Sequence, residues 1–135
     1  MGQKIALDTS VWIYALENNA KFFRSAVGVL EQIESGSAAA CFSVIGMIEL
    51  LTGPKFLGET IIAEQYKHQL ANFPNLTIVG ISENIVDLSS DLRAKYGLHT
   101  PDAIHVATAI DFGASVFITT DKTLKKVKEI RTKIL

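Results

Sequence analysis

The sequence predicts an α/β protein in which a parallel sheet is covered by helices on both faces. Short apolar segments rich in β-branched residues, such as Leu76-Thr77-Ile78-Val79, alternate with segments whose apolar residues recur at helical spacing, such as Ala20–Ser35. The segments between the strands are long enough for helical crossovers, which parallel strands require. The composition, 48% apolar and 20% charged, is that of a globular chain, and 135 residues is the size of one domain, so we expect a single domain over residues 1–135.

The first half of the chain predicts two strands and four helices. Thr9 and Ser10 offer capping hydroxyls for the first helix, and Ser43 offers one for the third, which Gly53-Pro54 should end. The expected strands are Lys4–Asp8 and Ala38–Phe42, and the expected helices are Val11–Leu16, Ala20–Ser35, Val44 to about Thr52, and Gly58–Phe73.

The second half predicts the remaining elements in the same alternation. Ser82 caps one helix, while Thr100 followed by Pro101 marks the start of another, with proline at the first helical position. Gly97 and Gly113 follow these helices as stops. The expected strands are Leu76–Val79, Val116–Thr119 and a short Lys133–Leu135, and the expected helices run from Ser82 to about Tyr96, from Thr100 to Phe112 and from Thr123 to Lys128.

Glu49 is the most informative residue, because it lies near the end of the apolar stretch Ala38–Leu51. A carboxylate withdrawn from water without a partner costs several kcal/mol, and an acid late in a helix opposes the helix dipole by roughly 0.3–1 kcal/mol. We therefore expect a bound cation beside it, or a buried salt bridge. Asp8 and Asp121 follow predicted strands, where ligands gather in parallel sheets, and Asp102 opens a predicted helix.

Carboxylates without clustered His or Cys suit Mg²⁺ or Mn²⁺, which prefer oxygen ligands. Such an ion orients and activates a water and neutralises charge on a phosphate under attack. No phosphate-binding glycine motif is present, so a nucleic-acid strand is a better substrate than a nucleotide held by its own loop. The alternative for Asp8, Asp102 and Asp121 is that each caps a helix or complements its dipole.

The last fifteen residues, 121–135, carry six basic and two acidic side chains, although the whole chain has a net charge of −1. Lys122, Lys125 and Lys126 are the candidates for holding a phosphate backbone. The alternative is a solvated helix face.

Four motifs together resemble the PIN domain, and among its members the VapC-type toxin ribonucleases. They are Asp8-Thr9-Ser10 after an apolar strand, Ile48-Glu49-Leu50, Thr100–Ala109 (TPDAIHVATA) and Ile118-Thr119-Thr120-Asp121. The resemblance covers essentially the whole chain, with the motifs in order.

The resemblance implies a three-layer α/β/α sandwich with a parallel sheet of about five strands. It also implies Mg²⁺- or Mn²⁺-dependent hydrolysis of single-stranded RNA, a small antitoxin protein that blocks the enzyme, and a homodimer. By position, Asp8, Glu49, Asp102 and Asp121 match the family's acidic quartet and Thr119 matches its hydroxyl near the metal, with Ser10 a weaker match. The helical pair Val44–Phe73 is the expected site of partner contacts.

Two rival functions remain open at this point. One is a PIN-like module that binds RNA or protein without catalysis, which an intact acidic quartet argues against. The other is a phospho-acceptor receiver or an aspartate phosphatase; the phosphatase pattern requires a second Asp where this chain has Ser10, and a receiver has no use for Glu49.

The remaining features concern environment and packing. The lone Cys41 fits a reducing cytoplasm, and no stretch is long and apolar enough to predict a membrane span, so we expect a cytoplasmic protein without membrane contact. Trp12 could stack on a base, but core packing is the better reading. His105, one turn after Asp102, is more simply structural than catalytic.

Overall fold

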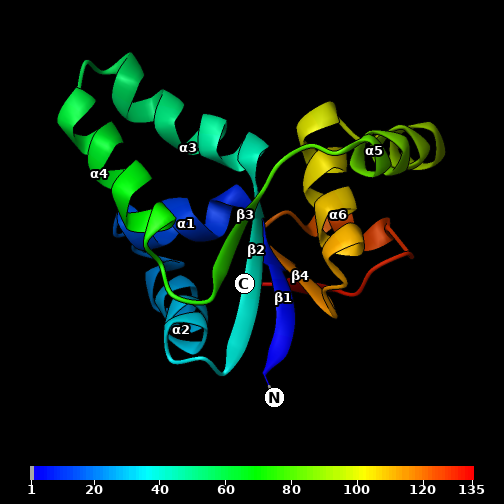
Figure 1. Ribbon diagram of the computed structural model, residues 1–135, viewed down its shortest axis with the longest axis horizontal. Coiled ribbons are helices and arrows are strands. Elements are labelled where there is room, and N and C mark those ends of the chain that lie inside the picture. The colour runs from blue at the N-terminus through cyan, green and yellow to red at the C-terminus, as the bar shows by residue number, and fades with distance from the viewer. Residues whose placement is uncertain (1) are drawn as a thin grey trace.

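A computed structural model describes residues 2–135 and shows one parallel sheet of five strands in the order β3-β2-β1-β4-β5 (Figure 1). Every strand pair is parallel. The strands are β1 (Gln3–Leu7), β2 (Ala38–Ser43), β3 (Leu76–Val79), β4 (Val116–Thr119) and β5 (Thr132–Ile134). The helices are α1 (Thr9–Leu16), α2 (Phe23–Glu34), α3 (Val44–Phe56), α4 (Thr60–Ala71), α5 (Glu83–Tyr96), α6 (Thr100–Phe112) and the short 3₁₀ helix η1 (Lys122–Lys126). The predicted fold class and strand number are confirmed.

Alternate residues along the central strands serve two hydrophobic cores, one on each face of the sheet. Ile5 and Leu7 of β1 face the core under α1 and α2, whereas Ala6 between them faces the core under α5 and α6. Phe42 and Cys41 of β2 divide in the same way. Figure 1 shows α1–α4 on one side of the sheet and α5 and α6 on the other. Because successive side chains of a strand point to opposite faces, both faces of the sheet are apolar and both are covered by helices, which gives three layers.

The helix starts agree with the sequence analysis at two positions and differ at two others. Ser43 and Ser82 cap α3 and α5, as predicted. Thr9 and Ser10 do not cap α1: Asp8 does, accepting from the backbone N–H of Thr9 at 2.8 Å. Thr100 is likewise inside its helix, because α6 is preceded by His99 at the cap position.

Several element boundaries shift by a few residues, and α3 shifts most. It continues through Gly53-Pro54 to Phe56, instead of ending near Thr52. A proline in the last turn removes only one helical donor, and the carbonyls of Gly53 and Pro54 still accept from Leu57 and Glu59. Two helices start later than predicted: α2 after Ala20 and α4 after Gly58. Near the end of the chain, a 3₁₀ helix over Lys122–Lys126 replaces the predicted helix Thr123–Lys128, and β5 spans Thr132–Ile134 in place of Lys133–Leu135.

The sheet reverses its direction of growth between β1 and β4. The chain proceeds from β1 to β2 to β3, then returns to add β4 on the other side of β1. The two strands are joined beyond their ladder by a hydrogen bond from the Asp8 amide to the Ile118 carbonyl at 2.9 Å. In parallel sheets a ligand site forms beyond the carboxyl ends of the strands at such a reversal. Within residues 2–135, none of the helices is both long and apolar enough to cross a membrane.

Candidate active site

Asp8 and Thr119 lie together at the carboxyl ends of β1 and β4. The Thr119 hydroxyl donates to Asp8 Oδ2 at 2.6 Å, and the other carboxylate oxygen accepts from the Thr9 amide. The Asp8 side chain is only 14% exposed, and Thr119 is fully buried. Both expected site residues are therefore held firmly, since a carboxylate that accepts two hydrogen bonds at the start of a helix is well fixed in direction.

Asp121 lies next to this pair but also serves as a helix cap. Its backbone N–H donates to Thr119 Oγ1 at 3.0 Å. Its Oδ1 accepts from the Thr123 amide at 3.0 Å and from the Thr123 hydroxyl at 2.7 Å, which caps η1. The capping alternative raised for Asp121 is thus correct for one carboxylate oxygen, and it leaves the other oxygen of the half-buried side chain available to the site.

Glu49 is not withdrawn from water, as its apolar neighbours in the sequence had suggested. Its side chain is 39% exposed, because this face of α3 lines the open carboxyl edge of the sheet instead of the core. The expectation of a buried carboxylate is therefore wrong, although the expectation of a partner is correct. Glu49 Oε1 lies 2.8 Å from His105 Nε2 and accepts from the Thr9 hydroxyl at 2.8 Å. These hydrogen bonds, the one from His105 first, lower the pKa of Glu49 against the opposing effect of partial burial.

His105 and Thr9 have contacts in the site that were not predicted, since His105 was expected to be structural and Thr9 to cap the first helix. The His105 side chain is 2% exposed, and its Nε2 also lies 3.8 Å from Asp8 Oδ1 and 3.1 Å from Thr9 Oγ1. It is buried, as a structural histidine would be, but it contacts two of the four predicted acids. The available signal was its spacing, since a residue three positions after Asp102 faces the same side of the helix.

Asp102 joins the group electrostatically and not by a hydrogen bond. Burial at the start of α6 raises the pKa of Asp102, and the negative charges of Asp8, Asp121 and Glu49 raise it further. The charges of the other three predicted acids are therefore close enough to Asp102 to affect its ionisation. Like charges brought together in this way favour either a proton or a cation.

The donor set fits a hard divalent cation, because it consists of carboxylate oxygens without thiols. The contacts that bring Asp8, Asp121 and Glu49 to this edge of the sheet, through Thr119 and His105, support this fit. Across residues 2–135, however, no three His, Cys, Asp or Glu side chains are gathered closely enough to form a ready coordination shell.

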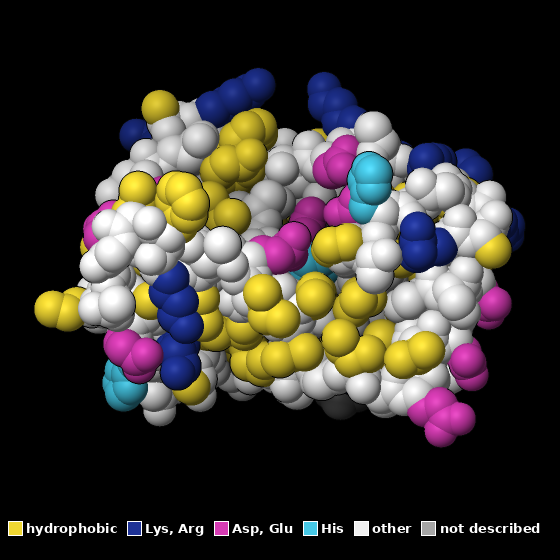
Figure 2. Space-filling model, turned by 90° about the horizontal axis from the view of Figure 1, so that it is seen from above, with side chains coloured by type: hydrophobic (Ala, Val, Ile, Leu, Met, Phe, Trp, Pro, Cys, Tyr) yellow, Lys and Arg dark blue, Asp and Glu magenta, His cyan; other side chains and the backbone are white. Residues whose placement is uncertain are grey.

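Figure 2 looks down on the carboxyl edge of the sheet and shows acidic side chains gathered near the middle of this face, with a histidine beside them, hydrophobic side chains around them and basic side chains at the periphery. Lys122, Lys125 and Lys126 are all exposed in η1, directly after Asp121.

Trp12 is 1% exposed and packs on Phe42 and Phe73, so the prediction that this residue belongs to the core is correct.

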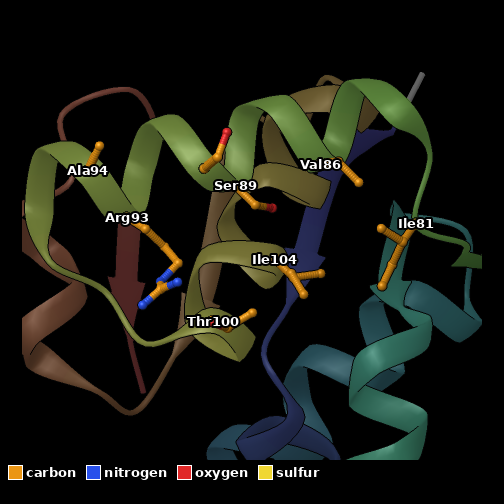
Figure 3. A pocket seen from close by; sticks show the side chains of 8 residues that line it. Ile81, Val86, Ser89, Arg93, Ala94, Thr100 and Ile104 are labelled. Atoms are coloured by element: carbon orange, nitrogen blue, oxygen red, sulfur yellow. The ribbon is translucent and has the colours of Figure 1, made fainter.

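A separate cavity of about 560 Å³ lies along α5 and α6 (Figure 3). Its walls combine apolar side chains with Arg93, whose Nε donates to the Leu98 carbonyl at 3.0 Å. The lining residues are Ile81, Val86, Ser89, Ser90, Arg93, Ala94, Thr100 and Ile104. None of the four predicted acids lines this cavity.

Solved structures with the same fold include several complexes of toxin-antitoxin systems. VapBC2 from Rickettsia felis bound to a promoter DNA fragment has 18% identity and a TM-score of 0.79, covering 98% of this chain and 99% of that one. A toxin-antitoxin complex from Klebsiella pneumoniae has 25% identity and a TM-score of 0.75 over 97% and 99% of the two chains. VapC20 from Mycobacterium tuberculosis, a toxin that cleaves the sarcin-ricin loop, has 14% identity and a TM-score of 0.68 over 94% and 98%.

No curated protein matches the sequence. The sequence model of the PIN domain, by contrast, matches residues 5–130, which include all four acids and Thr119. The order of the motifs, the parallel five-stranded sheet and this match agree, and the chain belongs to the PIN domain family.

Proposed function

We propose that residues 1–135 form a single nuclease domain that hydrolyses phosphodiester bonds of single-stranded RNA with Mg²⁺ or Mn²⁺, and that it is the toxin of a toxin-antitoxin pair. The observation that carries this proposal is the grouping of the predicted acids at the carboxyl edge of the sheet: the Thr119 hydroxyl bonds both the Asp8 carboxylate and the Asp121 backbone amide, and His105 lies close to both Asp8 and Glu49. Nuclease chemistry accounts for such a grouping, because the same carboxylates can hold a cation against a phosphate. Membership of the PIN domain family supports the reaction class.

The roles of the residues follow from their contacts. Asp8, Glu49, Asp102 and Asp121 would hold the ion, and Thr119 would keep Asp8 in position through its short hydrogen bond. When bound, the ion would favour the hydroxide form of a water and neutralise charge on the phosphate. Burial and the neighbouring acids disfavour the charged form of Asp102, so a bound cation would stabilise this carboxylate.

The exposed lysines after Asp121 would hold the RNA backbone beside the acids. Lys122, Lys125 and Lys126 project from a short helix whose cap is itself a site residue. A strand lying across the acids would thus meet positive charge at one end of the site, which offsets the repulsion between the acids and the phosphates.

The antitoxin proposal rests on surface as well as on fold. Phe56 and Leu57 at the end of α3 are 86% and 69% exposed, and Ile61 in α4 is 74% exposed. Apolar side chains this exposed on one helical pair are typical of a partner-binding surface. Met47 and Leu51, which lie within the helical pair Val44–Phe73 expected to contact a partner, are partly buried, and Met47 packs against the core. The solved toxin-antitoxin complex from Klebsiella pneumoniae supports the partner class. A homodimer stays a prediction, which sedimentation equilibrium can test.

Cleavage of a labelled single-stranded RNA tests the catalytic proposal directly. We expect cleavage with Mg²⁺ or Mn²⁺, none in EDTA, and recovery when the metal is restored. Asp8→Asn and Asp102→Asn should abolish cleavage, whereas Asp91→Asn, an exposed acid on α5 outside the site, should not. Full cleavage in EDTA would disprove the metal requirement. RNA binding without cleavage under any metal would favour the non-catalytic module.

A further inference from the structure

We infer that His105 is a positioning residue: its Nε2–H fixes one oxygen of Glu49, so that the other oxygen points to the proposed metal site. This inference rests on the proposed function for its purpose, but its geometry stands independently. It gives a specific function to a histidine that we expected to be simply structural.

The hydrogen bonds around His105 converge on one atom. Glu49 Oε1 lies 2.8 Å from both His105 Nε2 and Thr9 Oγ1, and these two atoms lie 3.1 Å from each other. Among the described residues, Glu49 Oε2 makes no hydrogen bond. A glutamate on an open surface would otherwise sample several rotamers, so two donors on one oxygen hold the carboxylate in a single direction.

The other ring nitrogen identifies the tautomer. His105 Nδ1 is buried and has no hydrogen-bond partner within residues 2–135. A proton on Nδ1 would be a buried donor without an acceptor, and it would leave the Nε2 lone pair facing a carboxylate oxygen at 2.8 Å. A single proton on Nε2 avoids both costs, since Nε2 then donates to Glu49 and an unpaired acceptor remains at Nδ1. We therefore assign the Nε2–H tautomer.

Two residues from β2 and α3 hold the imidazole ring in its place. Phe42 stacks on it with 6.0 Å between centroids and 21° between the ring planes. Gly46 in α3 leaves room for both rings: a Cβ there would lie 2.3 Å from the Phe42 ring and 2.9 Å from His105 Cε1. The absence of a side chain at position 46 is thus what allows α6 and α3 to approach closely enough for the His105–Glu49 contact.

Two substitutions of His105 separate positioning from simple packing. His105→Leu fills the volume without a donor, and His105→Gln places an amide N–H at the same number of bonds from the backbone. We expect His105→Leu to weaken Mn²⁺ binding and to lower RNA cleavage about 10- to 100-fold, the usual effect of losing a residue that orients a ligand. His105→Gln should recover most of both losses. Equal losses in two folded variants, or none in His105→Leu, would overturn the inference.

Gly46 offers an independent test with a matched control on the same helix. Gly46→Ala should displace the His105 ring and reproduce the loss of Mn²⁺ affinity seen in His105→Leu. Gly53→Ala adds the same methyl group to α3 where nothing lies within 4 Å, and should leave affinity and cleavage unchanged. Wild-type Mn²⁺ affinity in Gly46→Ala would contradict the proposed geometry.

The tautomer can be read without metal or RNA. Proton-nitrogen correlation spectra of the metal-free protein labelled with ¹⁵N-histidine should show His105 protonated at Nε2 and not at Nδ1, and His105→Gln identifies its signals by their loss. A proton on Nδ1 alone would overturn the inference whatever the activity. An Nε2 proton in a wild type that binds Mn²⁺ but cleaves no RNA would retain the inference and reject the nuclease proposal.

Discussion

Thr119 donates a hydrogen bond to Asp8, with 2.6 Å between Oγ1 and Oδ2, and so joins the ends of two neighbouring strands 111 residues apart in the sequence. Thr119 Oγ1 also accepts from the amide of Asp121 at 3.0 Å. One fully buried hydroxyl thus holds the side chain of Asp8 and the backbone of Asp121 at the reversal point of the sheet.

Removal of this hydroxyl should therefore destabilise the fold. Thr119→Val keeps the shape of the side chain but leaves the partly buried Asp8 carboxylate and the Asp121 amide each short of a partner. We expect a loss of about 1.5–3 kcal/mol in the free energy of unfolding, the range for a hydrogen bond to a charged group. Urea denaturation of the metal-free protein measures it. Thr119→Ser keeps the hydroxyl and should lose less, so a Val variant as stable as the Ser variant would contradict the role of the hydrogen bond.

Asp102→Asn should stabilise the metal-free protein while it abolishes cleavage. The folded state raises the pKa of this carboxyl above its ordinary 3.8, so that the unfolded chain ionises first as the pH rises. Its contribution to stability therefore falls as the pH rises from about 3.8 through the raised value. The difference in melting temperature between Asp102→Asn and wild type in EDTA should be small near pH 3.5 and should grow toward pH 7. A constant difference over this range would mean that folding does not raise the pKa of Asp102.

Replacing Lys122, Lys125 and Lys126 by Ala should weaken RNA binding and flatten its dependence on salt. Each lost phosphate contact lowers the log-log slope by about 0.7 for a single strand, or roughly 2 for all three. Cleavage at saturating RNA should change less. A control with Lys21, Lys55 and Lys67 replaced by Ala removes the same charge from exposed positions outside this segment and should keep the wild-type slope. An unchanged slope in the first variant would make its lysines a solvated face only.

Phe56→Asp should release the proposed antitoxin without changing the nuclease itself. Phe56 is 86% exposed and supports no packing in the described fold, so the isolated variant should melt and cleave RNA like wild type. A small protein encoded beside this one should co-elute with wild type in size-exclusion chromatography and suppress cleavage, and should lose affinity for Phe56→Asp. Separate elution from wild type, with cleavage intact, would reject the antitoxin.

Cys41 should be inert toward thiol reagents in the folded protein. Burial raises the pKa of this thiol to about 12, and the side chain is almost fully covered. Labelling at pH 8 should proceed only as fast as the chain opens, because the reactive thiolate is scarcely populated. Fast labelling without denaturant would show that the core beneath α5 and α6 opens locally.

Most of the fold could be predicted from local pattern. The alternation of β-branched segments and helical periodicity determined the order of every strand and helix, because strands and helices have different hydrophobic periods. Ser43 and Ser82 cap as predicted, because a cap requires only its own helix. The positions of Asp8 and Asp121 at the same sheet edge also follow, since strands that run parallel end together.

The tertiary structure alone decided which face of α3 is covered. Glu49 lies in a run that is apolar all around the helix, and a helical period cannot identify the buried side in such a run. The sheet leaves that face at its open edge, so Glu49 is 39% exposed and Ile48 is 59% exposed.

Sequence by itself determined the identity and order of the acids, and with them the chemistry that the site could support. It did not determine the partners of those acids. His105 meets Glu49 across 56 positions, and Thr119 meets Asp8 across 111. Such contacts depend on how closely whole helices and strands approach, which the missing Cβ of Gly46 decides for α3 and α6. Close packing is a property of surfaces brought together from distant segments, and no local pattern records it.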